Sequence, residues 1–480
     1  MMTGPLSQRI ADVFDLDPAA PALQFEGEWF TWGQLATSAR QVGAAGGTGR
    51  VGIMLRNEPA HVAALLGVLV AGGTVVVINP ARGDERTRAD IAALQLPVLV
   101  GLADDLDALA AQTTATTVAI SDLHRPPVIT PGTTGTDAGR PGVAVWMLTS
   151  GTTGPPKRVD LTYDMLARSV IGGDPEKSAP PTELRRAPAI VNSPLVHVGG
   201  VYRILLCVVE ARRFVLLRRF DLDQWARAVR EHRPRAVSLV PTALRMVLHS
   251  DLTRDDLAGV VAVTSGTAPL SADDADAFTE KFGIPVLTSY AATEFGGGAA
   301  GWTLADHRRH WHAKRGSVGR ANPGAQLRVV DDAGQPLGPD TPGLLEVKPS
   351  QLGPGTDWIR TTDLARIDAD GFLWILGRAD QAIIRGGFKV LPDDVRAALE
   401  SHPAVAGAAV IGAPDPRLGQ TPVAVVELRA DADPGEIIEF LGSRLARYEI
   451  PTEIVVVDAI PRTPSGKPDL PAVRSLLAQV

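Results

Sequence analysis

The stretch that decides the fold is Leu148-Thr149-Ser150-Gly151-Thr152-Thr153-Gly154-Pro155-Pro156-Lys157. It follows an apolar run at residues 143–147, whose β-branched and aromatic side chains predict a buried strand. Glycine lets a backbone approach an anion closely, hydroxyl groups add hydrogen-bond donors, and the lysine adds positive charge. A helical pattern resumes near residues 163–171. We therefore predict a phosphate-binding loop, although two prolines before the lysine distinguish it from the Walker pattern.

The whole ten-residue string closely resembles the phosphate loop of the adenylate-forming superfamily. This superfamily includes acyl- and aryl-CoA synthetases, peptide-synthetase adenylation domains and luciferases. The resemblance implies that the loop binds the phosphates of ATP. The residues that it assigns to this role are Thr149, Ser150, Gly151, Thr152, Thr153, Gly154 and Lys157. It also implies that Thr152 helps to hold Mg²⁺.

The composition is that of an ordinary globular protein. The chain has 480 residues, 45% of them hydrophobic and 21% charged, with a net charge of -7. This charge argues against a nucleic-acid partner. The only cysteine, Cys207, lies in an apolar run, which excludes an intramolecular disulfide and predicts a buried structural thiol. Because we find no secretory signal and no membrane span, we expect a cytoplasmic protein.

The predicted elements alternate between helix and strand, which is typical of an α/β fold with doubly wound sheets. We expect an N-terminal adenylation domain at residues 1–379, with a β-rich subdomain at about residues 326–376. A smaller, mobile α+β domain is expected at residues 380–480. Residues 103–141 are rich in Thr, Asp and Pro, and we expect most of this segment to be loop.

Four further segments match the same superfamily in the expected order. In the first, Tyr290-Ala291-Ala292-Thr293-Glu294 follows a predicted strand. The resemblance implies that Tyr290 stacks on adenine, Thr293 binds the α-phosphate and Glu294 holds Mg²⁺. A carboxylate is a suitable ligand for a Mg²⁺ ion that bridges phosphates. Ala291 stands where the family usually has glycine.

The second segment contains Asp363 and Arg378, which the resemblance assigns to the ribose of ATP. Thr362 stands where many relatives have glycine. In the third segment, the hinge about which the C-terminal domain rotates falls on Asp380. Gly386 and Gly387 then match the loop that lines the pantetheine path in CoA ligases.

The fourth segment places Lys467 in a loop near the C-terminus, within Pro464-Ser465-Gly466-Lys467. The resemblance implies that this lysine enters the active site and stabilises charge as pyrophosphate leaves. Leu470 stands where relatives often have arginine.

Weaker matches concern the acid substrate. His197 matches a gate beside the acyl group, and Gly266, Thr267 and Ala268 match backbone that flanks adenine. The predicted acid pocket consists of Val201, Tyr202, Val240, Gly266, Ala291 and Gly297. These residues are apolar or small and include no cation, which points to an aryl or modest acyl acid. Peptide-synthetase adenylation domains place an aspartate near this segment to bind the amino group of their substrate. We find no obvious equivalent here, which argues against an α-amino acid substrate.

The resemblance therefore predicts an acid-thiol ligase that uses ATP and Mg²⁺ to form an acyl-adenylate and then transfers the acyl group to coenzyme A. An amine or a carrier-protein thiol as acceptor remains an alternative. A nucleotide-binding protein without catalysis is a remote one. The expected partners are a small carboxylic acid, ATP and the acyl acceptor. A homodimer is one possible assembly, and the sequence does not determine the oligomeric state.

Overall fold

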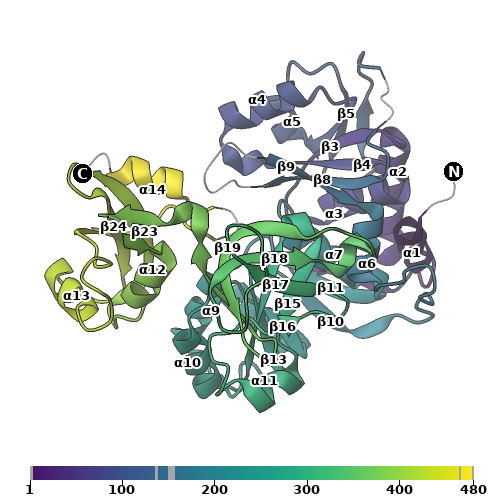
Figure 1. Cartoon of the computed structure of the whole chain (residues 1–480). Coiled ribbons are helices and arrows are strands. Elements are labelled where there is room, and N and C mark those ends of the chain that lie inside the picture. Colours follow the sequence, from purple (N-terminus) through teal and green to yellow (C-terminus); the bar gives the residue numbers. More distant parts are fainter. Residues whose placement is uncertain (1–3, 136–138, 150–156, 387, 464–465, 478–480) are drawn as a thin grey trace.

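The computed structural model describes residues 4–135, 139–149, 157–386, 388–463 and 466–477. Figure 1 shows a large body, which holds the chain up to β20, and a smaller lobe that contains β23, β24 and α12–α14. The α/β fold class with a large N-terminal region and a small C-terminal domain is confirmed. The boundary at Asp380 stays a prediction.

The first sheet has parallel strands at its centre, and they include the strand that precedes the predicted phosphate loop. Strand β4 (Thr74–Ile78) is buried along its whole length between β3 (Arg50–Met54) and β8 (Val143–Thr149). Val, Ile and Thr suit a central strand because their branched side chains pack well on a pleated surface. The carboxyl end of β8 therefore leads into the predicted loop. The outer strands are β5 (Val98–Leu102), β6 (Thr116–Ile120), β7 (Val128–Thr130) and β9 (Lys157–Thr162).

Helix α3 (Pro59–Val70), which packs on this sheet, approaches helix α2 (Trp32–Gly46) unusually closely. Helix α2 begins with a capping box in which Thr31 accepts from the backbone of Gln34. Helix α3 is buried all round. A Cβ atom at Gly67 would lie 2.0 Å from the carbonyl oxygen of Ala39, so only glycine allows this packing.

The expectation that most of residues 103–141 is loop is confirmed for the described residues, although three short elements within the segment were not predicted. This segment contains α5 (Ala103–Leu109), β6 and β7. Leu106 and Leu109 are buried, and two aspartates favour the first turn of α5. Strand β6 is rich in Thr, but it pairs with β5, so a partner in the sheet decides its conformation. Strand β9 was also missed.

Two further sheets complete the α/β part. One has the order β10-β11-β1-β2, with strands Arg185–Val191, Arg212–Leu216, Pro21–Phe25 and Glu28–Thr31. The other has the order β12-β13-β14-β15-β16, with strands Ala236–Ser238, Ala262–Ser265, Val286–Ala292, Gly297–Gly301 and Arg320–Ala321. Strands β10–β14 were predicted among alternating helices, whereas β1, β2, β15 and β16 were not predicted. The helices of the large body not yet bounded are α1 (Pro5–Phe14), α4 (Asp84–Leu94), α6 (Tyr163–Val170), α7 (Val198–Val209), α8 (Leu222–His232), α9 (Pro241–Leu248), α10 (Ala272–Phe282) and α11 (Leu304–His310). Cys207 on α7 is buried, as predicted.

The change to short strands near residue 326 is confirmed. An antiparallel sheet contains β17 (Gln326–Val330), β18 (Gly343–Lys348), β19 (Ile359–Ile367) and β20 (Leu373–Arg378). In β19 and β20, Asp363 lies directly opposite Arg378. This pairing places the two predicted ribose contacts on neighbouring strands.

The C-terminal lobe has its own sheet and its own core. Its strands are β21 (Ile383–Arg385), β22 (Phe388–Val390), β23 (Val405–Asp415), β24 (Gly419–Leu428) and β25 (Glu453–Val457). Its helices are α12 (Pro392–Glu400), α13 (Pro434–Leu441) and α14 (Leu470–Leu477). A cluster of buried side chains around Val410, Ala424 and Leu441 fills the space between sheet and helices.

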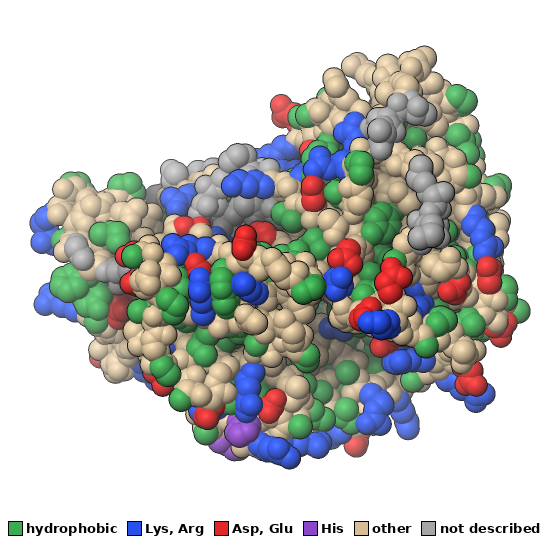
Figure 2. Space-filling view, turned by 45° about the vertical axis from the view of Figure 1, so that its right-hand side comes forward, with side chains coloured by type: hydrophobic (Ala, Val, Ile, Leu, Met, Phe, Trp, Pro, Cys, Tyr) green, Lys and Arg blue, Asp and Glu red, His purple; other side chains and the backbone are tan. Residues whose placement is uncertain are grey.

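Positive and negative side chains are interspersed on the face drawn in Figure 2, without a continuous basic area. Among the described residues, no helix combines the length and the apolar character that a bilayer crossing requires.

Candidate active site

The predicted adenine and ribose residues meet directly. The hydroxyl of Tyr290, on β14, donates a hydrogen bond to a carboxylate oxygen of Asp363, on β19. Burial raises the pKa of both groups, and the hydrogen bond from Tyr290 partly offsets the shift at Asp363. The tyrosine therefore orients a carboxylate that keeps further lone pairs for other donors.

Arg378 lies beside this pair and makes a two-pronged ion pair with Asp380. Its Nε and Nη2 atoms donate to the Asp380 carboxylate at 2.9 and 2.7 Å. This hydrogen bond raises the pKa of Arg378. The residue predicted as the hinge is thus tied to a residue predicted to bind ribose.

Lys467 reaches this group from the C-terminal lobe. Burial and the nearby Arg378 lower the pKa of its ammonium group, whereas Asp363, Asp393 and Glu294 act in the opposite direction. These charges come from β19, β20, α12 and the short turn η2 (Thr293–Phe295). The structure therefore brings together Tyr290, Glu294, Asp363, Arg378 and Lys467.

Glu294 is exposed on η2 and has no ion-pair partner within the described part of the chain. Those residues hold no group of three or more metal-ligating side chains. A single free carboxylate still suits Mg²⁺, because this ion is often held by one or two carboxylates together with substrate phosphates. Glu294 therefore fits the implied metal, and Thr293 is its neighbour on the same turn.

The backbone that was predicted to flank adenine has an unusual conformation. Thr267 has a φ of +71°, in the left-handed region that non-glycine residues seldom adopt. A Cβ atom at Gly266 would lie 2.9 Å from Oγ of Ser289. The buried hydroxyl of Ser265 has no hydrogen-bond partner among the described residues. Ala268 follows in an irregular segment that is half-buried. This strand end therefore offers close backbone approach and an unpaired polar atom.

His197 is the residue before α7 and faces the same region. Burial, and then the charge of Lys467, lower its pKa to about 4. Its Nε2 atom is buried and has no partner in the described structure. The imidazole is therefore neutral at pH 7 and carries one nitrogen available to a ligand.

The predicted acid-pocket residues do not all face one cavity. Val201 is fully buried within the main core, and Tyr202 is half-buried with a pKa raised by burial. A Cβ atom at Gly297 would meet Oγ of Ser169 at 2.6 Å, so this position faces α6. A Cβ atom at Gly466, next to Lys467, would lie 3.9 Å from the side chain of Val240. Ala291 is exposed on β14.

Sequence reasoning missed Arg203, which follows Val201 and Tyr202 on α7. Its Nη2 atom donates to Oγ1 of Thr264 at 3.1 Å, two residues before Gly266. Within the described residues, no carboxylate forms an ion pair with it. Arg203 is thus a cation adjacent in sequence to two residues of the predicted acid pocket, and the prediction of that pocket did not include it. The contact joins residues 61 positions apart, and no local pattern signals it.

The base of the predicted phosphate loop is formed by two strands. Thr149 ends β8 and pairs in register with Lys157, the first residue of β9. The predictions for Ser150, Gly151, Thr152, Thr153 and Gly154 lie outside the described residues. Gly386 has a φ of +57° and contacts Leu418 in the C-terminal lobe, and Gly387 lies outside the described residues as well.

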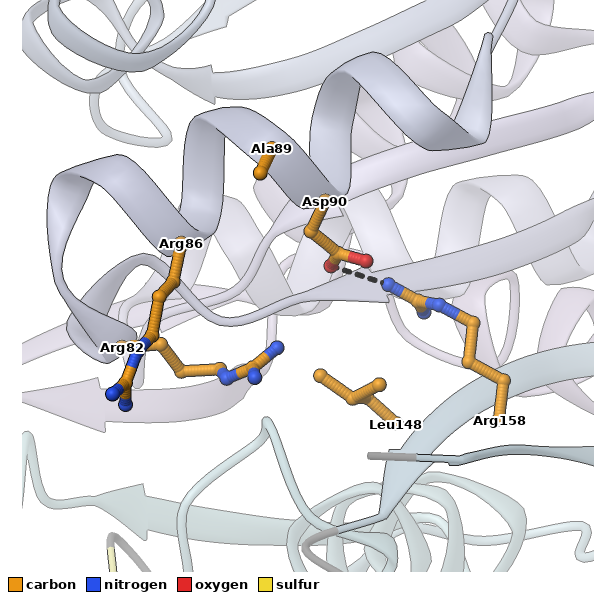
Figure 3. Close-up of a pocket in the computed structure, with 6 residues that line it drawn as sticks. All are labelled: Arg82, Arg86, Ala89, Asp90, Leu148 and Arg158. Atoms are coloured by element: carbon orange, nitrogen blue, oxygen red, sulfur yellow. Dashed lines mark hydrogen bonds and ion pairs between the residues drawn. The ribbon is translucent and has the colours of Figure 1, made fainter. Parts of the chain in front are cut away.

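A basic cavity of about 360 Å³ lies beside the end of β8. Figure 3 shows the Arg158–Asp90 ion pair, at 2.6 Å, and the side chain of Arg82 that extends toward Leu148. Arg86 and Ala89 complete the wall. None of the residues predicted to act in catalysis lines this cavity.

Comparison with known proteins shows the family to which the chain is similar. Residues 12–355 match the family model described as AMP-binding enzyme, and residues 394–467 match the model of the AMP-binding enzyme C-terminal domain. The chain is 32% identical over 343 residues to 4-coumarate–CoA ligase-like 8 of Arabidopsis thaliana, covering 68% of this chain and 61% of that protein. It therefore spans less than two thirds of that relative's length.

Other similarities extend over the whole chain. Sulfoacetate–CoA ligase of Cupriavidus necator is 31% identical over 488 residues, which cover 92% of this chain and 91% of that protein. An ATP-bound structure of MatB from Rhodopseudomonas palustris superimposes with a TM-score of 0.82 at 26% identity, covering 99% of both chains.

Proposed function

We propose, from the premise that this chain belongs to the AMP-binding enzyme family, that it activates a carboxylic acid with ATP and transfers the acyl group to CoA. The observation that carries this proposal is the position of Lys467. A lysine from the C-terminal lobe lies among Tyr290, Glu294, Asp363 and Arg378 of the large body, where its charge can act on a bound nucleotide.

In the first half-reaction, a carboxylate oxygen of the acid attacks the α-phosphorus of ATP. The bond from this phosphorus to the bridging oxygen breaks, and pyrophosphate leaves with the electron pair. The products are acyl-adenylate and pyrophosphate. The ammonium group of Lys467 stabilises the negative charge that develops on the phosphate oxygens. Phosphoryl transfer depends chiefly on such positioning and electrostatic stabilisation.

The nucleotide is held by the residues around Asp363. Its carboxylate accepts hydrogen bonds from the ribose hydroxyls while the Tyr290 hydroxyl fixes its orientation. Arg378 retains Nη1 for the ribose, because Nε and Nη2 bind Asp380. The backbone at Gly266, Thr267 and Ala268 flanks the adenine. Glu294, with Thr152, would hold Mg²⁺, and the ion would neutralise phosphate charge.

The acid lies near His197 and Arg203. Since the pKa of His197 is lowered to about 4, its imidazole is neutral and acts as a polar wall rather than a cation.

In the second half-reaction, the sulfur of CoA attacks the acyl carbonyl carbon, and AMP leaves with its carboxylate-derived oxygen. Gly386 and Gly387 line the pantetheine path. Two relatives are named as ligases that join an acid to CoA, which supports CoA as the acceptor.

An amine or a carrier-protein thiol is the alternative acceptor, because neither requires a change in the first half-reaction. A nucleotide-binding protein without catalysis is a remote alternative, because such a protein would not need Lys467 at this position. We also propose a cytoplasmic location and a homodimer. Light scattering on the purified protein tests the homodimer.

The proposal is tested by measuring pyrophosphate release with a panel of aryl and aliphatic acids, with and without CoA. We expect release that requires an acid and reaches many turnovers only with CoA. A single turnover that CoA does not change would favour an amine or a carrier protein. Absence of release with every acid, despite ATP binding, would contradict the proposal.

A further inference from the structure

Helix α9 is one of the parts of the large body that contact the C-terminal lobe, together with β20. Contacts to that lobe occur at the beginning, the middle and the end of this short helix. At its beginning, a Cβ atom at Gly466 would lie 3.0 Å from Oγ1 of Thr242. At its end, Nη1 of Arg429 donates to Nε2 of His249 at 2.6 Å.

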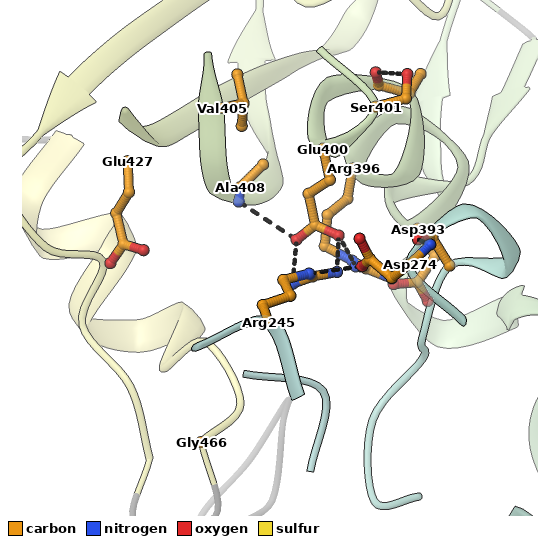
Figure 4. Close-up of polar contacts among 12 residues, drawn as sticks. Arg245, Asp274, Asp393, Arg396, Glu400, Ser401, Val405, Ala408, Glu427 and Gly466 are labelled. Carbon is orange, nitrogen blue, oxygen red and sulfur yellow. Dashed lines mark hydrogen bonds and ion pairs between the residues drawn. The ribbon is translucent and has the colours of Figure 1, made fainter. Parts of the chain in front are cut away.

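The middle contact is an ion pair between the two parts. Nη2 and Nη1 of Arg245 donate to the two carboxylate oxygens of Glu400, at 2.7 and 3.3 Å. The two side chains are only 10% and 7% exposed. Figure 4 shows the Arg245 guanidinium between Glu400 of the lobe and Asp274 of the large body. Such a buried, two-pronged pair has a defined geometry as well as a strong attraction.

Each partner of this pair is also held by its own part of the protein. Arg245 donates from Nε to Asp274 on α10 at 2.7 Å. Glu400 accepts from Arg396 on α12 at 2.7 Å and from the backbone of Ala408. Because both side chains are fixed on their own side, the pair sets the position of the lobe rather than following it.

This position determines where Lys467 lies. Lys467 directly follows Gly466, which contacts the start of α9. An opening of the Arg245–Glu400 pair would move the lobe relative to α9 and withdraw the ammonium group from Asp363. Asp393, which raises the pKa of Lys467, also accepts a hydrogen bond from Arg396 at 3.2 Å.

We propose that Arg245 and Glu400 are positioning residues for the acid-activating step, which hold Lys467 in the cleft through the docking of the lobe on α9. This inference rests on the proposed two-step function. The thioester-forming step needs no lysine at the phosphates, so the pair should favour the first half-reaction only.

The test compares Glu400→Gln with a matched control, Glu346→Gln. Glu346 has a 6% exposed side chain and pairs with two arginines, Arg328 and Arg360, but all three belong to the same sheet. Both variants therefore lose one equally buried carboxylate. Acyl-adenylate formation is measured in single turnovers, and thioester formation is measured from supplied acyl-adenylate and CoA.

We expect Glu400→Gln to slow acyl-adenylate formation at least tenfold and to leave thioester formation within about twofold. Glu346→Gln should change the two rates by the same factor. An equal loss of both half-reactions in Glu400→Gln, or no loss of either, would overturn the proposal.

A second measurement does not depend on catalysis. Spin labels at Asp255→Cys and Glu439→Cys, both exposed positions, report the distance between the two parts, while the native Cys207 is buried. We expect one narrow distance distribution in the parent and in Glu346→Gln, and an added population in Glu400→Gln. An unchanged distribution in Glu400→Gln would refute the docking role even if no acid substrate had been found.

Discussion

Among single residues, Lys467 carries the charge on which the proposed first half-reaction depends. Its replacement by alanine removes an ammonium group placed beside Asp363 and Arg378. We expect Lys467→Ala to slow acyl-adenylate formation by about 10²–10³-fold, as for the loss of one preorganised group that stabilises a transition state. Rapid quenching with labelled ATP measures this rate, and a rate within threefold of the parent would show that Lys467 is not that group.

Tyr290 is expected to act through Asp363. Tyr290→Phe keeps the aromatic ring but removes the donor to the carboxylate. A hydrogen bond to a charged group contributes about 1.5–3 kcal/mol, so we expect the KM for ATP to rise about tenfold or more. The same hydrogen bond lowers the pKa of Asp363, so the acidic limb of KM against pH should move to higher pH in the variant. Identical KM profiles for parent and variant would exclude this role.

Arg203 should influence the choice of acid. Its guanidinium has one neutral partner, Thr264, and no ion-pair partner in the described chain. We expect acids with a second anionic group to be preferred over neutral acids of the same size, and Arg203→Met to reduce that preference about tenfold. The ratio of kcat/KM for such a pair of acids measures the effect, with the neutral acid as internal control. An unchanged ratio would place Arg203 outside the acid site.

The residues of the candidate site differ in how far the sequence predicts them. Tyr290, Asp363 and Lys467 stand in ordered motifs, so the sequence alone identifies them. Arg203, Arg245 and Glu400 stand in ordinary helices. Their partners are distant along the chain, and the importance of an arginine on a helix depends on the tertiary contact that it makes.

At the scale of elements, His249 at the end of α9 should make the docking of the C-terminal lobe depend on pH. This imidazole faces Arg429, Asp274, Lys281 and Arg245, and burial and Arg429 lower its pKa below 6.5. The docked state therefore binds a proton less readily than the undocked one, so the contribution of His249 to docking is full above pH 6.5 and is lost as the pH falls below it.

The ratio of the two half-reaction rates should show this dependence between pH 7.5 and pH 5.5. We expect acyl-adenylate formation to fall relative to thioester formation at the lower pH, and His249→Gln to remove this difference. A ratio that stays constant in the parent would contradict a role of His249 in docking.

The elements that the sequence predicts best are those with strong apolar periodicity, such as β4 and α2. Strands β6, β7 and β9 escape prediction because each has few apolar residues, so that pairing with a neighbouring strand decides their conformation. The β-rich segment is predictable because Asp-Gly and Gly-containing turns separate its strands.

At the scale of the whole molecule, the structure combines a large α/β body with a smaller C-terminal lobe (Figure 1). Lys467 of the lobe lies near enough to Asp363 and Arg378 of the large body for their charges to affect its pKa. The fold class and the order of the motifs could be predicted from the sequence, since both depend on local patterns. The docking of the lobe could not be, because it depends on side chains from α9, α10 and α12 that meet only in the folded protein.

The most direct test of the acyl-adenylate follows the oxygen of the acid. The acid found with the panel is labelled with ¹⁸O in its carboxylate, and AMP is analysed by mass spectrometry after turnover with ATP and CoA. The proposed mechanism predicts that each AMP carries one ¹⁸O atom, because the carboxylate oxygen stays on the α-phosphorus when the thiol displaces it. The thioester keeps the other labelled oxygen as its carbonyl. Unlabelled AMP, or label in the pyrophosphate, would contradict the formation of an acyl-adenylate by this protein.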